Sequence, residues 1–197
     1  MKKNSFVLGC IGFVLQACLA LPGAYAQGGP DLAATLNAQK DALKTMAFMD
    51  GEWRGSAWTL GRDGKRHDIT QTERIGPLLD GSIKLIEGRG YNADGSTGFN
   101  AFGVLAFDPT TKTWTLTSWA QGHQGEFVLT PKPDGYVWTI PAGPNATIRY
   151  TAVVKGDTYK EIGEYLAEGK PPHQTFEMNL TRVGPSAWPG AGGLGPK

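Results

Sequence analysis

Gly51-Glu52-Trp53-Arg54-Gly55 divides the 197-residue sequence into two parts. The residues after it have the pattern of many short strands, and the residues before it have the pattern of a leader and a helix. Gly51 permits a tight turn as the chain enters a strand, and the indole of Trp53 is large enough to fill the end of a small barrel. We therefore predict that this stretch opens the first strand of a closed sheet.

A second stretch, from Phe176 to Arg182, has the alternation expected of the last strand. Arg182 carries a planar cation that can lie on the aromatic face of Trp53 and so close the barrel. The alternative is an ordinary core tryptophan and a solvated arginine.

Gly51-x-Trp53 at the start of the first strand, with Arg182 at the end of the last, resembles the signature of the calycin superfamily. That superfamily contains lipocalins, fatty-acid-binding proteins and nitrobindins. The stretch from Gly51 to Arg182 is more closely similar to an uncharacterised bacterial exported domain family with a lipocalin-like barrel. The matching segments are residues 50–55, 103–108, 157–159 and 176–182. The resemblance implies a fold rather than an activity, because one fold hosts many functions.

Residues 1–26 have the features of a signal peptide. Two lysines near the start precede an apolar segment, residues 6–21, and Ala24-Tyr25-Ala26 is a small-x-small cleavage site. The alternative is a membrane anchor, but the apolar segment is short for a spanning helix and the cleavage pattern follows it closely. We therefore expect a mature chain that begins at Gln27, is periplasmic or secreted, and has no membrane span.

Cleavage would remove both cysteines, Cys10 and Cys18, so the mature chain would use neither a disulfide nor thiol chemistry. It would also change the formal net charge from +1 to −1, because two lysines and no acid are lost. A nearly neutral chain gives no electrostatic reason to expect nucleic acid as a partner. About 170 residues remain, which is enough for one domain with a substantial core.

The mature chain is predicted to have three parts. Residues 27–49 form a leader and a helix, because residues 31–48 are rich in helix formers and Asp31 can cap their start. Residues 50–183 form one all-β domain, since Asp-Gly pairs and similar turns separate about ten alternating segments of an antiparallel barrel. Residues 184–197 form a flexible tail rich in glycine and proline. The predicted strands are residues 52–60, 66–75, 82–91, 100–107, 112–120, 123–130, 135–141, 146–154, 157–166 and 173–182.

Strand alternation predicts which residues face the barrel interior. If Trp53 and Arg182 point inward, every second residue of the last strand does so too, and the apolar residues fall together on that side. The predicted interior residues are Trp114, Leu116, Phe127, Leu129, Tyr136, Trp138, Ile140, Ile148, Tyr150, Ala152, Phe176, Met178 and Leu180.

Two neighbouring strands carry polar residues in their apolar rows. Gln71 and Glu73 share a row with Ile69 and Ile75, and Glu87 and Arg89 share a row with Ile83 and Leu85. Because successive strands of a meander lie side by side, the four polar residues are predicted to meet on the inner wall. A polar-headed ligand or an acid–base step requires such groups in an apolar interior. The alternatives are plain surface charges, or a simple ion pair between Glu73 and Arg89.

Two classes of function fit this pattern. The first is binding or carriage of a small hydrophobic or amphipathic ligand. The second is a cofactor-independent lyase, isomerase or cyclase, with Glu73 or Glu87 as general base and Arg89 stabilising negative charge. The candidate ligand-binding residues are Gln71, Glu73, Glu87, Arg89, Trp114, Phe127, Trp138 and Tyr150.

No cofactor or metal site is expected from the motifs, because His67, His123 and His173 are isolated in the sequence. The resemblance to nitrobindins, which bind haem through a late histidine, adds haem binding through His173 as a lesser alternative.

Overall fold

The computed structural model describes residues 31–61 and 63–186. The predicted signal peptide and most of the predicted tail lie outside these residues. The first described element is helix α1 (Leu32–Lys44), which is followed by the short 3-10 helix η1 (Ala47–Met49). As predicted, Asp31 caps α1, and its side chain accepts hydrogen bonds from the backbone of Ala33 and Ala34.

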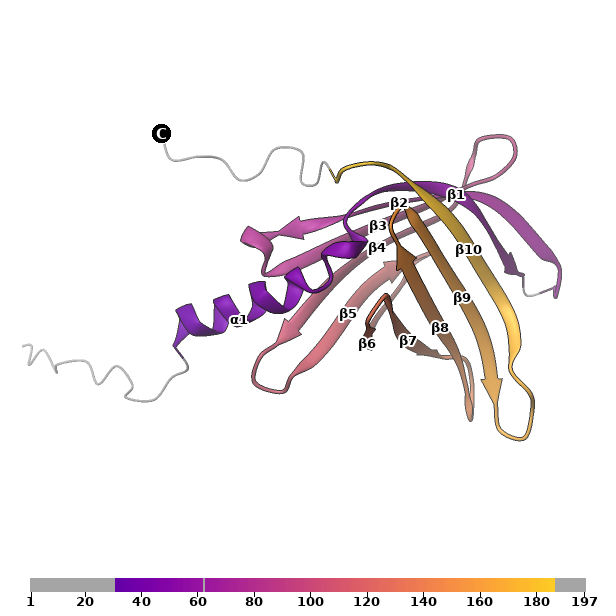
Figure 1. Cartoon of the computed structure of the whole chain (residues 1–197). Coiled ribbons are helices and arrows are strands. Elements are labelled where there is room, and N and C mark those ends of the chain that lie inside the picture. Colours follow the sequence, from indigo (N-terminus) through magenta and orange to yellow (C-terminus); the bar gives the residue numbers. More distant parts are fainter. Residues whose placement is uncertain (1–30, 62, 187–197) are drawn as a thin grey trace, which may run out of the picture. The chain divides into compact units, whose positions relative to one another are not determined.

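Ten antiparallel strands form a closed barrel in which each strand pairs with its sequence neighbours and β1 pairs with β10 (Figure 1). This architecture confirms the predicted all-β barrel with an N-terminal helix. The strands are β1 (Gly51–Leu60), β2 (Arg66–Leu78), β3 (Ile83–Tyr91), β4 (Thr97–Asp108), β5 (Thr113–Ala120), β6 (His123–Lys132), β7 (Gly135–Pro141), β8 (Ala146–Lys155), β9 (Thr158–Ala167) and β10 (His173–Gly184).

One end of the barrel is closed by Trp53 and Arg182, as the sequence predicts. The guanidinium carbon of Arg182 lies 4.0 Å from the centre of the Trp53 ring, and the two residues are paired across β1 and β10. Trp53 is 1% exposed, and its indole N–H donates a hydrogen bond to the Met49 carbonyl at 2.9 Å. A cation against a desolvated aromatic face is worth more than one in water, so this contact stabilises the closure.

Arg182 also satisfies backbone groups at the closed end. Its guanidinium donates to the carbonyls of Asp50, Phe48 and Gly156 and pairs with Asp157. Gly51 is required beside it, because its φ is +146° and an added Cβ would lie 2.5 Å from Arg182 Nη1.

The helical segment contributes to the same end of the barrel. Leu43, Met46 and Met49 are buried in one hydrophobic cluster with Trp53. Helix α1 contacts β3, β4 and the 3-10 helix η2 (Leu79–Gly81) that joins β2 to β3. The cluster therefore seals the end at which β1 begins.

A charged pair lies at the closed end as well. Lys84, 2% exposed, forms an ion pair with Asp50. Burial lowers the pKa of Lys84, whereas the hydrogen bond and charge of Asp50 oppose that shift. The pair neutralises a cation that could not be left alone in this position.

The opposite end is the rim, formed by the connections β1–β2, β3–β4, β5–β6, β7–β8 and β9–β10. Positive φ angles at Gly64 and Gly95 confirm the predicted turns at Asp63-Gly64 and Asp94-Gly95.

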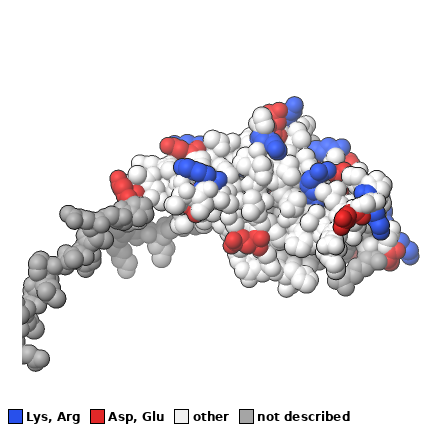
Figure 2. All heavy atoms as spheres, turned by 90° about the horizontal axis from the view of Figure 1, so that it is seen from below, with Lys and Arg blue, Asp and Glu red and all other residues white. Residues whose placement is uncertain are grey.

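Within the described ranges, no helix combines the length and apolar character needed to cross a membrane. Figure 2 shows basic and acidic side chains lying next to each other on the face that it displays, with uncharged surface between these groups.

Candidate functional site in the barrel interior

The strand register confirms the predicted interior. Directly opposed residues of an antiparallel pair lie on the same face of the sheet, so the inward direction of Trp53 can be followed around the barrel. By this rule Met178 and Leu180 on β10 face inward, and so do their partners Glu161 and Tyr159 on β9. Ala152 on β8 pairs with Glu161 and faces inward as well. All thirteen residues predicted to face inward lie on this inner row.

Burial along the inner row differs between the two ends. Close to the closed end the interior side chains are almost inaccessible, for example Leu105 at 0% and Leu129 at 2%. Further toward the rim, inward-facing side chains are only half-buried although strands surround them. These residues are Ile69, Glu73, Phe127, Trp138, Tyr150 and Phe176. Solvent therefore reaches the inner wall above the closed end.

Glu73 lies on the inner wall in β2, between the pairing partners Trp53 and Gly88. The side-chain N–H of Gln71, itself 3% exposed, donates a hydrogen bond to Glu73 Oε1 at 2.7 Å. The carboxyl lies directly over Gly88, since a Cβ there would be 2.8 Å from Glu73 Oε1. The missing side chain at Gly88 therefore makes the space that Glu73 occupies.

The environment of Glu73 favours its protonated form. Burial raises the pKa of Glu73 to about 8, and repulsion from Glu161 and Glu87 acts in the same direction. The hydrogen bond from Gln71 opposes the shift because it stabilises the ionised form.

A second interior carboxyl, Glu161 on β9, is missing from the residues selected by sequence. It is 8% exposed and accepts a hydrogen bond from the indole N–H of Trp138 at 2.9 Å. Burial raises the pKa of Glu161 to about 7, and the hydrogen bond from Trp138 lowers it. The interior thus holds two acids that titrate near neutral pH.

Aromatic rings lie on the inner wall beside Glu161. The rings of Trp138 and Tyr150 are stacked, with centroids 4.5 Å apart and an interplanar angle of 16°. Phe127 lies 5.5 Å from Trp138 on one side, and Phe176 lies 5.8 Å from Tyr150 on the other. Burial raises the pKa of Tyr150 to about 12, so its hydroxyl remains neutral and can donate a hydrogen bond.

Two further tyrosines lie deeper, below the acids. The hydroxyls of Tyr136 and Tyr159 are hydrogen-bonded to each other, and both residues are buried. Burial raises the pKa of each well above its usual value, and the charge of Glu161 adds to the shift. Trp114, also predicted to bind ligand, lies on the inner row at the closed end beside Phe107, with ring centroids 5.0 Å apart.

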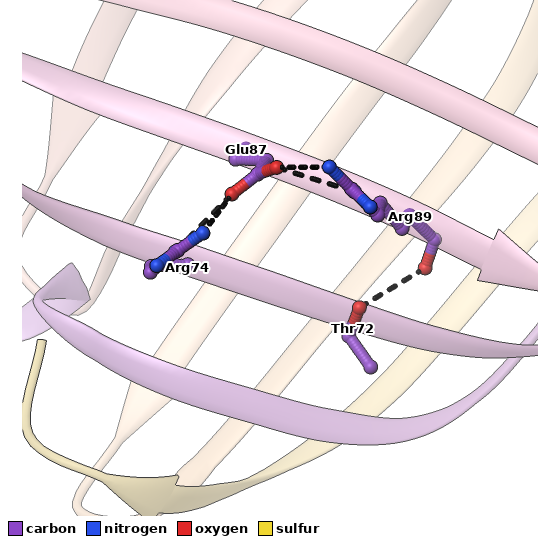
Figure 3. Close-up of polar contacts among 4 residues, drawn as sticks. All are labelled: Thr72, Arg74, Glu87 and Arg89. Carbon is purple, nitrogen blue, oxygen red and sulfur yellow. Dashed lines mark hydrogen bonds and ion pairs between the residues drawn. The ribbon is translucent and has the colours of Figure 1, made fainter. Parts of the chain in front are cut away.

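The predicted meeting of four polar residues on the inner wall is wrong for Glu87 and Arg89. Glu87 pairs with Arg74 in the register and Arg89 with Thr72, so both face outward (Figure 3). Glu87 bridges the two arginines, with Arg74 Nη2 at 2.6 Å and Arg89 Nη2 at 2.8 Å. The alternative of a Glu73–Arg89 ion pair is wrong for the same reason.

The cause is the composition of β3. Its inner row holds Lys84, Ile86, Gly88 and Gly90, whereas Ile83 and Leu85 face outward. Apolar side chains usually mark the inner face of a strand, but on β3 two of the inner residues are glycines and two of the outer residues are apolar. Alternation alone therefore assigns the outer row of β3, which contains Glu87 and Arg89, to the interior. The outward-facing charged residues Arg54, Arg74, Glu87 and Arg89 are among those that line a shallow groove of about 310 Å³.

The three histidines are at or next to the rim. His123 and His173 are the first residues of β6 and β10, His67 is the second residue of β2, and all three are exposed. No group of three or more histidine, cysteine, aspartate or glutamate side chains in the described ranges is arranged to hold a metal ion. His173, the haem ligand that the resemblance to nitrobindins would imply, is exposed at the start of β10, and haem binding through it stays a prediction.

Comparison with known proteins supports the architecture. No protein-family model matches the sequence, and no curated protein matches it. Among solved structures, the crystal structure of Rv2717c from M. tuberculosis is similar, with a TM-score of 0.55 and 13% sequence identity. The similarity covers 72% of this chain and 96% of that chain. At this identity the likeness concerns the fold alone, and with the closed ten-stranded antiparallel barrel it fits a calycin-like fold.

Proposed function

We propose that the protein binds a small, largely apolar or amphipathic molecule inside its barrel, in the periplasm or outside the cell. One observation carries the proposal: half-buried aromatic rings share the inner wall with two carboxyls. Ligand sites of proteins are usually apolar cavities with a few polar groups that orient the ligand. The proposed location rests on the leader sequence alone.

The interior glycines support the same proposal. An added Cβ at Gly163 would lie 2.9 Å from Tyr150 Cε1 and 2.9 Å from Phe176 Cβ. These rings therefore lie against the backbone of the wall, as Glu73 lies against Gly88. Larger residues at these positions would push the ring and the carboxyl toward the centre of the barrel.

A pair of matched variants tests whether the ligand site is the interior. Ile69 faces inward and is half-buried, whereas Thr70 is exposed on the outer face. We expect Ile69→Trp to weaken binding of the neutral fluorophore N-phenyl-1-naphthylamine at least tenfold, and Thr70→Trp to leave it unchanged. Fluorescence titration measures both. Equal affinities in the two variants, or no saturable binding by the wild type, would exclude the proposed site.

A second function, acid–base catalysis, is favoured by the pKa values of about 8 for Glu73 and about 7 for Glu161. A general base works best when its pKa lies near the working pH. Glu87 and Arg89 have no part in it because they face outward. The remaining candidate base is Glu73. Glu161 has the lower pKa of the two and ionises first, so it is not the proton donor.

Deuterium exchange tests this function without a known substrate. An ionised Glu73 would take a proton from the carbon next to the carbonyl of 2-tetralone, and the enolate would take a deuteron from a carboxyl equilibrated with D₂O. We expect protein-dependent exchange by NMR at pH 8 that disappears in Glu73→Gln. Exchange at the same rate in Glu73→Gln would rule out this role for Glu73.

A further inference from the structure

Among residues 31–61 and 63–186, Glu73 and Glu161 share the interior without a basic partner. The hydrogen-bond donors to their carboxyls are the neutral groups of Gln71 and Trp138. In the described part of the chain, the carboxylates that form ion pairs do not include Glu73 or Glu161. Buried acids are usually paired, so two acids without a cation call for one from outside the chain.

The cations that point into the described barrel are already bound elsewhere. Lys84 is paired with Asp50, and Arg182 lies on Trp53 and is bound to three carbonyls and Asp157. Both lie at the closed end. His67, His123 and His173 are exposed at or next to the rim. The other titratable groups on the inner rows of β7, β8 and β9 are Tyr136, Tyr150, Tyr159 and Tyr165.

The charge of Glu161 acts on Glu73, and the charges of both acids act on Tyr136 and Tyr159. Repulsion from Glu161 contributes to the raised pKa of Glu73, and the charges of both acids contribute to that of Tyr159. A negative potential therefore develops in this part of the interior whenever either acid ionises. It would be relieved by a positive charge placed between them.

The wall beside the acids suits an organic cation rather than a metal ion. The stacked pair of Trp138 and Tyr150, with Phe127 and Phe176 at its two sides, offers half-buried aromatic surface next to Glu161. The negative faces of aromatic rings attract ammonium groups, and Trp does so most strongly. The same rings provide apolar surface for the body of the molecule.

We infer that the barrel interior binds an amphipathic organic cation, whose ammonium group lies between Glu73 and Glu161 and whose apolar part packs on the Trp138–Tyr150 stack. This inference rests on the proposed ligand-binding function and specifies its ligand class. A neutral ligand that accepts hydrogen bonds from protonated carboxyls is the competing outcome.

Three ligands with the same chain and different head groups test the inference: octyltrimethylammonium, 1-octanol and octanoate. We expect the wild type to bind the ammonium compound at least tenfold more tightly than octanol at pH 7.5, and octanoate least tightly. In the double variant Glu73→Gln/Glu161→Gln, the preference for the ammonium compound over octanol should disappear while octanol still binds. Isothermal titration calorimetry measures each affinity, and circular dichroism verifies the fold.

The control is Glu87→Gln, which removes a charge from the outer face of the same hairpin and should keep the preference. Equal binding of octanol and the ammonium compound by the wild type overturns the inference but leaves the proposed function standing. A preference retained in the double variant overturns the assignment to these two carboxyls. If none of the three ligands binds, both the inference and the proposed function fail.

Discussion

Glu73 and Glu87 are neighbours in the β2–β3 register, yet their carboxyls lie on opposite faces of the barrel wall. Glu73 pairs with Gly88 and points inward, and Glu87 pairs with Arg74 and points outward. The two environments shift the two pKa values in opposite directions. Burial raises the pKa of Glu73, whereas for Glu87 the contacts with Arg74 and Arg89 outweigh partial burial and lower it.

The opposite shifts predict opposite effects of the same substitution on stability. The ordinary pKa of Glu73 is 4.5 and its folded value is about 8, so the folded state holds the proton more tightly. The stabilisation is complete below about pH 4.5 and is lost as the pH rises to about 8. We therefore expect Glu73→Gln to match the wild type at pH 5 and to be more stable at pH 8.5, by about 1–3 kcal/mol after allowance for partial solvent exposure. Urea unfolding at the two pH values measures this.

Glu87→Gln should behave in the reverse way. The lowered pKa of Glu87 stabilises the folded state above the ordinary value of 4.5, and this contribution is lost as the pH falls through the lower folded value. We expect the variant to be less stable than the wild type at pH 8.5, by about 1 kcal/mol, and the deficit to shrink below pH 4. The same direction of change for both variants at pH 8.5 would contradict the assigned faces.

Trp138→Phe tests the contact between Trp138 and Glu161. Phenylalanine keeps an aromatic ring beside Tyr150 but cannot donate the indole hydrogen bond, which lowers the pKa of Glu161. We expect the pKa of Glu161 to rise above about 7, as measured by carbon NMR of the labelled carboxyl. Trp119→Phe, at an outward and 41% exposed position, is the control and should leave that pKa unchanged. An unchanged Glu161 pKa in Trp138→Phe would mean that the hydrogen bond does not form.

The sequence predicts most of this barrel for a physical reason. On β7, β8 and β10 the inner positions carry mainly apolar residues and the outer ones mainly polar residues, so the pattern of period two is strong. On β9 both rows mix charged and apolar residues: Tyr159, Glu161, Gly163 and Tyr165 in one row, and Lys160, Ile162, Glu164 and Leu166 in the other. Alternation cannot select between such rows, which is why Glu161 is missed. The signal that finds it is its pairing with Ala152 and Met178.

Two arginine–tryptophan contacts can be compared, one at the closed end of the barrel and one next to the rim. Arg182 lies over the buried Trp53, and Arg66 lies 4.8 Å from the ring centre of the surface residue Trp58. Lysine keeps the charge but loses the planar fork that reaches several carbonyls. We expect Arg182→Lys to lower the free energy of unfolding by about 2–4 kcal/mol, and the exposed Arg66→Lys to lower it much less. Thermal and urea unfolding measure both, and similar losses would show that the closed end has no special role.

Gly55 and Gly88 both face the interior, but an added side chain would meet backbone at Gly55 and a movable side chain at Gly88. An added Cβ at Gly55 would collide with the backbone carbonyl of Asn179 on β10, which cannot move without breaking the pairing of β1 with β10. An added Cβ at Gly88 would meet the end of the Glu73 side chain, which can rotate away. We expect Gly55→Ala to destabilise the barrel by about 3 kcal/mol or more, and Gly88→Ala by less than about 1 kcal/mol.

Gly88→Ala should nevertheless change the interior, because the displaced carboxyl of Glu73 no longer lies against the wall. The expected result is a fold that melts close to the wild-type temperature but binds octyltrimethylammonium at least threefold more weakly, with octanol binding less affected. Calorimetric titration and thermal unfolding of the same preparation separate the two effects. A large loss of stability in Gly88→Ala would mean that Glu73 is held rigidly by its surroundings and is part of the core rather than of a ligand site.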